Sequence, residues 1–73
     1  MERMLRYSLD RKRKIRVMWQ QDGQMRQKLC QVIAMNAERV ELDIARPREQ
    51  VKVALADILS ADYRKGDEAQ LDD

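Results

Sequence analysis

In the stretch from Lys14 to Trp19, the large apolar residues Ile15, Val17 and Trp19 alternate with Lys14, Arg16 and Met18. This period of two is typical of a strand that buries one of its faces. The next turn signal is Asp22-Gly23, where glycine adopts positive φ without steric cost. The pattern therefore predicts a hairpin in which the second strand covers Met25–Met35.

Two pairings of this hairpin are possible. A two-residue loop at Asp22-Gly23 would pair Trp19 with Arg26, which mixes apolar and charged side chains on one face. A three-residue loop, Gln21–Gly23, closed by a glycine bulge, would pair Trp19 with Met25 on one face. On the other face it would pair Arg16 with Lys28 and Met18 with Arg26. The second pairing gives one mostly apolar face and one basic face, so we predict the three-residue loop.

The rest of the chain continues with short segments separated by turns. Apolar residues at helical spacing predict a short helix in Met1–Arg13, and a bulge or bend is expected near the middle of the second strand. Alternation predicts three further strands, at Arg39–Ala45, Val51–Leu55 and Ile58–Tyr63. The predicted core consists of Ile15, Val17, Leu29, Val40, Leu42, Ile44, Val53, Leu55 and Ile58.

One helix followed by five hairpin-linked strands predicts a mainly β fold, a small and strongly bent five-stranded antiparallel barrel. A chain of 73 residues fits a single domain, which we place at residues 1–66. Residues 67–73 are polar and acidic, and we expect them to form a disordered tail.

Charge is distributed unevenly along the chain. Residues 1–30 carry nine Lys and Arg against three acids, a balance of +6, whereas residues 31–73 carry six against ten, a balance of −4. Such an asymmetry is typical of proteins that bind an anionic partner, and of oligomers in which a basic surface of one subunit contacts an acidic surface of another. The predicted positive patch, a candidate nucleic-acid contact, consists of Arg11, Lys12, Arg13, Lys14, Arg16, Arg26 and Lys28, with Arg46 and Arg48 as an extension.

Several kinds of chemistry have no residues to carry them. The chain has no histidine, one cysteine and two glycines, so it offers no ordinary zinc site, no Ser/His or Cys/His pair and no phosphate-cradling glycine loop. We therefore expect neither enzyme activity nor a cofactor. With no apolar run long enough to span a bilayer and only Cys30 as a thiol, we expect a cytoplasmic protein.

Aromatic residues are few: Trp19, Tyr7 and Tyr63. By the predicted register Trp19 belongs to the core. Nucleic-acid binding would then depend on phosphates rather than on stacked bases.

Several segments resemble those of a known group of small barrels. Met4–Leu9 is similar to the short helix that opens a WYL domain, and Val53–Ile58 is similar to its final strand and turn. With Ile15–Trp19 and Asp22-Gly23 between them, the chain resembles Sm-like, SH3-type barrels, and more closely the WYL-domain and YolD-like bacterial proteins. The Trp-Tyr-Leu signature itself is missing, because Val40–Leu42 stands at its place, and no binding residue of the family is assigned here.

The resemblance implies a module of bacterial regulatory type, since WYL domains are associated with sensing ligands or nucleic acids and YolD-like proteins with DNA-damage responses. Two hypotheses follow from the residues themselves: a binding module that contacts nucleic acid through a basic face, or a structural or adaptor module. The second would act through protein contacts or self-association of exposed strand edges, as a dimer or larger homo-oligomer. Small-ligand sensing is implied by the resemblance alone.

Overall fold

The structure is a computed structural model, and it describes residues 1–67. The fold is mainly β, an antiparallel five-stranded sheet with one short N-terminal helix, as the sequence predicts. The elements, in chain order, are α1 (Glu2–Arg11), β1 (Ile15–Gln21), β2 (Gln24–Met35), β3 (Arg39–Ile44), β4 (Glu49–Ala54), the 3₁₀ turn η1 (Leu55–Asp57) and β5 (Ile58–Tyr63). The predicted acidic tail lies, apart from Asp67, outside the described residues.

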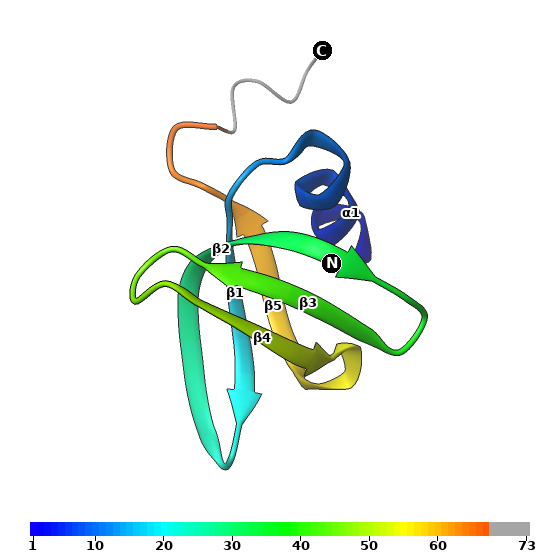
Figure 1. The fold of residues 1–73 in the computed structure, drawn as a ribbon, viewed down its shortest axis with the longest axis vertical. Coiled ribbons are helices and arrows are strands. Elements are labelled where there is room, and N and C mark those ends of the chain that lie inside the picture. The colour runs from blue at the N-terminus through cyan, green and yellow to red at the C-terminus, as the bar shows by residue number, and fades with distance from the viewer. Residues whose placement is uncertain (68–73) are drawn as a thin grey trace.

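The strand order in the sheet is β4-β3-β2-β1-β5. The prediction of a strongly bent barrel is wrong, because the sheet is not closed and β4 and β5 are its two edges. Long β2 joins the two parts of the sheet, with β1 and β5 on one side of it and β3 and β4 on the other (Figure 1). Its pairing with β3 shifts between Val32 and Ala34, which confirms the bulge expected within this strand, though nearer its end than its middle.

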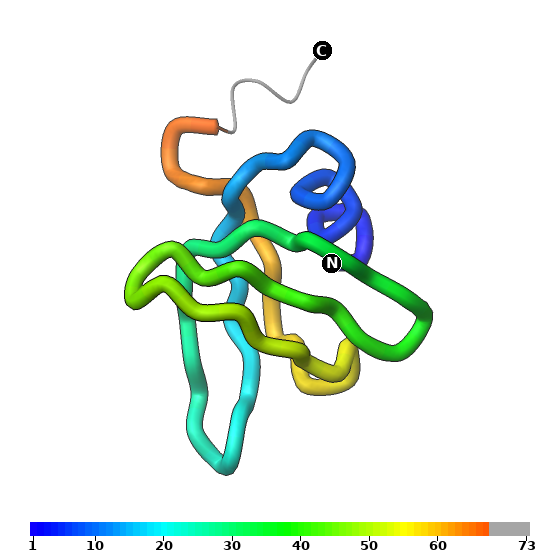
Figure 2. The backbone as a smooth tube through the Cα atoms, in the orientation of Figure 1, coloured from blue at the N-terminus to red at the C-terminus, as the bar shows by residue number. Residues whose placement is uncertain are grey.

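The β1–β2 hairpin projects beyond the rest of the sheet (Figure 2). Its turn has two residues, so the predicted three-residue loop is wrong: Gln21 pairs with Gln24 and Trp19 pairs with Arg26. Asp22 and Gly23 both have positive φ, 53° and 78°, and two such residues match the right-handed twist of the flanking strands. Aspartate tolerates this backbone conformation better than most residues do, so the favourable turn decides the pairing.

One face of the sheet is buried together with the inner side of α1. The buried hydrophobic residues are Leu5, Ile15, Val17, Trp19, Cys30, Val32, Val40, Leu42, Ile44, Val53 and Ile58. Two predicted core residues, Leu29 and Leu55, are only partly buried. Leu29 faces the other side of β2 because of the corrected register, and Leu55 belongs to η1 rather than to a strand.

The helix α1 contacts β2 and β5. It buries Leu5 and Ser8, which are three positions apart and therefore lie on one face of a helix. The rings of Tyr7 and Tyr63 meet edge to face, with centroids 5.2 Å apart, and this contact ties the helix to β5. The helix ends at Arg11, and the C-cap residue Lys12 has a φ of 54°, the left-handed conformation that commonly terminates helices.

The buried hydroxyl of Ser8 joins three segments of the chain. Its Oγ donates a hydrogen bond of 2.6 Å to the carbonyl oxygen of Arg13 and accepts one of 2.9 Å from the N–H of Val32. Because β1 begins at Ile15, opposite Cys30, it does not reach Val32, and the serine hydroxyl takes the place of a strand partner. The contact satisfies a buried backbone donor beside the bulge and fixes the helix on the sheet.

Short connections join β2 to β3 and β3 to β4. The Oδ1 of Asn36 accepts hydrogen bonds of 2.8 Å from the N–H groups of Glu38 and Arg39, and this closes the β2–β3 turn. The β3–β4 loop contains Pro47 and is shorter than predicted, because β4 begins at Glu49. Within residues 1–67 no helix combines the length and apolar character that crossing a membrane requires.

We predict that Ser8→Ala lowers the free energy of unfolding by about 1–3 kcal/mol, because it leaves the buried N–H of Val32 without a partner. Chemical denaturation measures the change. Ser60→Ala is the matched control, since Ser60 is exposed on β5 and surface substitutions usually stay within about 0.5 kcal/mol. Equal stability of the two variants would contradict the role of Ser8.

Candidate functional site

The predicted positive patch is divided between the two faces of the sheet. Arg26 and Lys28 lie on the same face as Trp19 and Val17, with which they pair across the hairpin. Arg16 pairs with Leu29 and lies on the opposite face. The expected pairing of Arg16 with Lys28, and of Met18 with Arg26, is therefore wrong, because the two-residue turn moves every residue of β2 by one position.

Arg16 is held within the fold on the outer face of the sheet. Its Nη2 lies 3.7 Å from the Oδ2 of Asp62 on β5, and its Nε donates a hydrogen bond of 3.1 Å to the carbonyl oxygen of Tyr63. The positive charge is partly neutralised by this pair, which weakens the case for Arg16 as a contact for an anion.

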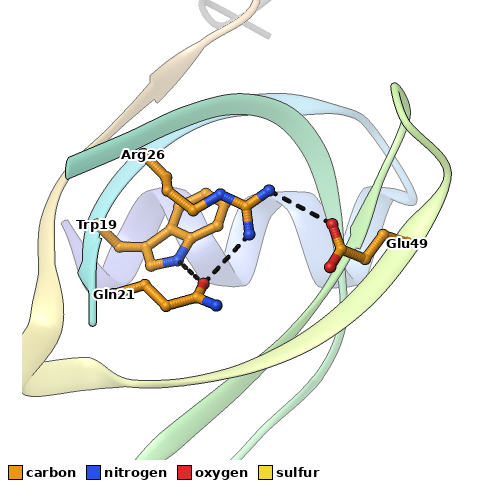
Figure 3. A network of polar contacts seen from close by, with 4 residues as sticks. All are labelled: Trp19, Gln21, Arg26 and Glu49. Carbon is orange, nitrogen blue, oxygen red and sulfur yellow. Dashed lines mark hydrogen bonds and ion pairs between the residues drawn. The ribbon is translucent and has the colours of Figure 1, made fainter. Parts of the chain in front are cut away.

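Arg26 takes part in a network that covers Trp19 (Figure 3). Its guanidinium lies 5.3 Å from the centroid of the indole, within the range of a cation–π interaction. The Oε1 of Gln21 accepts hydrogen bonds from both the Trp19 Nε1, at 3.1 Å, and the Arg26 Nη1, at 3.2 Å. The Arg26 Nη2 lies 3.3 Å from the Oε1 of Glu49 on β4, so the hairpin and β4 are joined by an ion pair.

The network explains how the hairpin can place a cation beside its largest apolar side chain. Trp19 is fully buried, and Arg26 is partly buried over it with its charge satisfied at Gln21 and Glu49. The pairing of an arginine with a tryptophan can be read from the sequence. Matching apolar residues with apolar residues, however, disfavours this pair. Trp19 is a core residue, as expected, and it offers no face to a nucleic-acid base.

The connector that follows α1 is basic and exposed. Arg11, Lys12, Arg13 and Lys14 are all exposed, as expected of a surface patch. Arg13 forms an ion pair of 3.2 Å with Asp67, whose carboxylate therefore reduces the positive charge at that position.

A shallow hollow of about 280 Å³ lies between the end of this connector and the β3–β4 loop. We call it the basic hollow, and its residues are Lys14, Asp43, Ile44, Ala45, Arg46 and Arg48. In residues 1–67 none of its three cations has a carboxylate within ion-pair distance. Arg46 and Arg48, the predicted extension of the patch, thus share a hollow with Lys14 and not with Arg16.

Asp43 is the one charged member of the basic hollow that the sequence did not suggest as part of a site. It stands on β3, and its charge acts on the buried thiol of Cys30, which faces the core. Burial, and then the carboxylate of Asp43, raise the pKa of Cys30 from 9.0 to about 12. The thiol therefore stays protonated at neutral pH, as expected for a core cysteine rather than a reactive one.

Two other hollows are lined by both positive and negative side chains. One of about 400 Å³ lies between the end of β1 and β4, where Asp22, Lys52 and Asp57 contribute charges of both signs. The other, of about 310 Å³, lies beside the β2–β3 turn and includes Arg39, Glu41 and Lys52. Within the described residues no three His, Cys, Asp or Glu side chains form a group that could hold a metal ion.

No family model, no curated protein and no solved structure matches this chain. Functional inference therefore depends on the geometry of the described residues.

We predict that Arg26→Ala shifts the fluorescence emission of Trp19 to longer wavelength and increases its quenching by acrylamide, because the guanidinium no longer covers the indole. The free energy of unfolding should fall by about 1–2 kcal/mol. Glu49→Gln is the control: it removes an exposed ion pair, which is worth at most about 1 kcal/mol, and leaves the guanidinium on the ring. Unchanged emission in Arg26→Ala would show that other residues exclude water from Trp19.

The raised pKa of Cys30 predicts a loss of stability in alkaline solution. Above pH 9 the thiol of the unfolded chain ionises, whereas the folded thiol stays protonated until about pH 12, so unfolding releases a proton in this range. The stability of the wild type should fall more steeply between pH 9 and pH 11 than that of Cys30→Ala, which lacks the thiol. Denaturation curves across this range measure both slopes, and parallel slopes would contradict the shift.

Proposed function

We propose that this protein is a non-enzymatic binding module that contacts nucleic acid through its basic surface. The observation that carries the proposal is the unneutralised charge around the end of the connector. Arg11, Lys12, Lys14, Arg46 and Arg48 are exposed, and within residues 1–67 no ion pair involves them. The arginines with acidic partners, at positions 13, 16 and 26, have less charge to offer an anion.

The aromatic residues support contact with phosphates rather than with bases. Trp19 is fully buried, and Tyr7 and Tyr63 pack against each other between α1 and β5. Stacking on exposed aromatic rings is the common way of holding single-stranded bases, and it is not available on these three side chains. We therefore propose weak binding that tolerates any base sequence and weakens steeply as salt concentration rises.

The resemblance to Sm-like, SH3-type barrels and to WYL-domain and YolD-like proteins remains part of the proposal. It is supported by the order of the elements, one helix and then five antiparallel strands with a hairpin at Asp22-Gly23. It carries the expectation of a module of bacterial regulatory type.

We predict that the wild type binds labelled single- and double-stranded oligonucleotides at low salt, as measured by fluorescence anisotropy. The logarithm of the affinity should fall linearly with the logarithm of salt concentration, because bound cations release counterions. The double variant Arg11→Glu/Lys14→Glu should weaken binding at least about tenfold, whereas Arg39→Glu/Lys65→Glu should weaken it less at the same net charge. Absence of wild-type binding at high micromolar concentration would refute the proposed function.

Self-association is the second candidate, and the open edge of β4 favours it. The N–H of Leu55 donates to the carbonyl oxygen of Glu38, next to β3, with a distance of 2.8 Å. By alternation, the N–H and C=O groups of Gln50, Lys52 and Ala54 face away from β3, and within residues 1–67 β4 has no other strand neighbour. A free row of this kind pairs readily with a strand of another molecule, so an adaptor that forms dimers or larger rings is the alternative.

If this candidate is correct, light scattering at tens of micromolar protein gives a mass of a dimer or larger assembly. Lys52→Pro should shift the mass toward the monomer, since proline removes a donor on the free edge and no bond to β3. Lys52→Ala keeps the donor and is the control. A monomeric wild type at every salt concentration would eliminate this candidate.

A further inference from the structure

We propose that the basic hollow holds one phosphodiester group of a nucleic-acid backbone, with Lys14, Arg46 and Arg48 as its ligands. The proposal deepens the proposed function and rests on it, since it says which cations make the central contact and what they contact. It assigns a role to three residues from two separate segments, the end of the α1–β1 connector and the β3–β4 loop.

The fold brings these segments together through β2. Ile15 at the start of β1 pairs with Cys30 of β2, and Cys30 pairs on its other side with Ile44 at the end of β3. The residue before Ile15 and the residues after Ile44 are therefore at one end of the sheet, at neighbouring positions. Lys14 thus lines one hollow of about 280 Å³ together with Arg46 and Arg48, which follow it by more than thirty positions in the sequence.

The chemistry of the three cations fits a phosphate. Arginine presents a planar fork of donors that matches two oxygens of a phosphate, and lysine adds a point charge. The hollow is open to solvent and is lined by the end of β3 and by residues of the two connections beside it, so a group at the surface of a polymer can enter it without leaving its chain.

A nucleic-acid backbone can make contacts that a free phosphate cannot. The connector runs from the hollow toward Arg11, three residues away from Lys14, a reach of at most about 10 Å. Phosphates follow one another along each strand of duplex DNA at about 3.4 Å of axial rise. A backbone with one phosphate in the hollow can therefore place its neighbours beside Arg11 and Lys12.

Asp43 sets the strength of this contact. Its carboxylate lines the same hollow and opposes an incoming anion, which leaves a local balance of three positive charges against one negative. Replacing it by asparagine removes the repulsion and keeps the shape of the side chain. The proposal thus predicts variants that change affinity in opposite directions.

The experiment compares Arg48→Glu, Asp43→Asn and Arg39→Glu with the wild type, using a fluorescein-labelled 20-nucleotide oligo(dT) and a duplex of mixed sequence. Arg39 is exposed at the opposite end of β3, so Arg39→Glu is matched in charge with Arg48→Glu but lies away from the hollow. We expect Arg48→Glu to weaken binding to both probes at least about tenfold and to reduce the salt slope by about one. Asp43→Asn should tighten binding several-fold, and Arg39→Glu should change it less than twofold.

Equal loss in Arg48→Glu and Arg39→Glu, with no gain in Asp43→Asn, would overturn the assignment of the hollow and leave the proposed function intact. Circular dichroism melting of each variant shows whether it is folded at the temperature of the measurement. Amide chemical shifts on titration with inorganic phosphate provide a separate readout. Shifts centred on residues 43–48 support the hollow as the phosphate site, and shifts elsewhere, or tighter binding of phosphatidylserine vesicles than of either oligonucleotide, count against it. Absence of binding to both oligonucleotides would refute this assignment together with the proposed function.

Discussion

The two-residue turn at Asp22-Gly23 is the constraint on which the rest of the arrangement depends. It decides which face of the sheet each side chain of β2 occupies, and β2 contacts both β1 and β3. Because of this register Arg26 meets Trp19, Cys30 and Val32 enter the core, and Met25 is left 63% exposed. The separation of Arg16 from Lys28, and with it the location of the basic surface, follows from the same turn.

A small domain has few side chains with which to cover a tryptophan. Here the cover is an arginine whose stem and guanidinium shield the indole while its charge stays paired with Gln21 and Glu49. The ion pair between Arg26 and Glu49 also joins the β1–β2 hairpin to β4. Arg26 therefore serves the fold, whereas Lys14, Arg46 and Arg48 have no acidic partner within residues 1–67 and are the cations that the proposed binding would use.

The alternation of apolar residues was enough to predict one helix, five strands, the bulge in β2 and most of the core. It was not enough for the hairpin register, because matching apolar with apolar residues undervalues the stacking of arginine on tryptophan and the preference of the turn for positive φ. It also missed the role of Ser8, which nothing in its local sequence distinguishes from a surface serine. The basic hollow depends on the proximity of Lys14 to Arg46 and Arg48, which only the topology of the sheet provides.

The Ser8 contacts have a consequence for cooperativity. An isolated helix of ten residues is marginal in water, so α1 persists because it is docked. Undocking it breaks the bond to Val32 and exposes the bulge of the central strand at the same time. We therefore expect the helix and the sheet to open as one unit, so that hydrogen exchange of the Val32 amide would report on the opening of the whole domain rather than on fraying of its N-terminus.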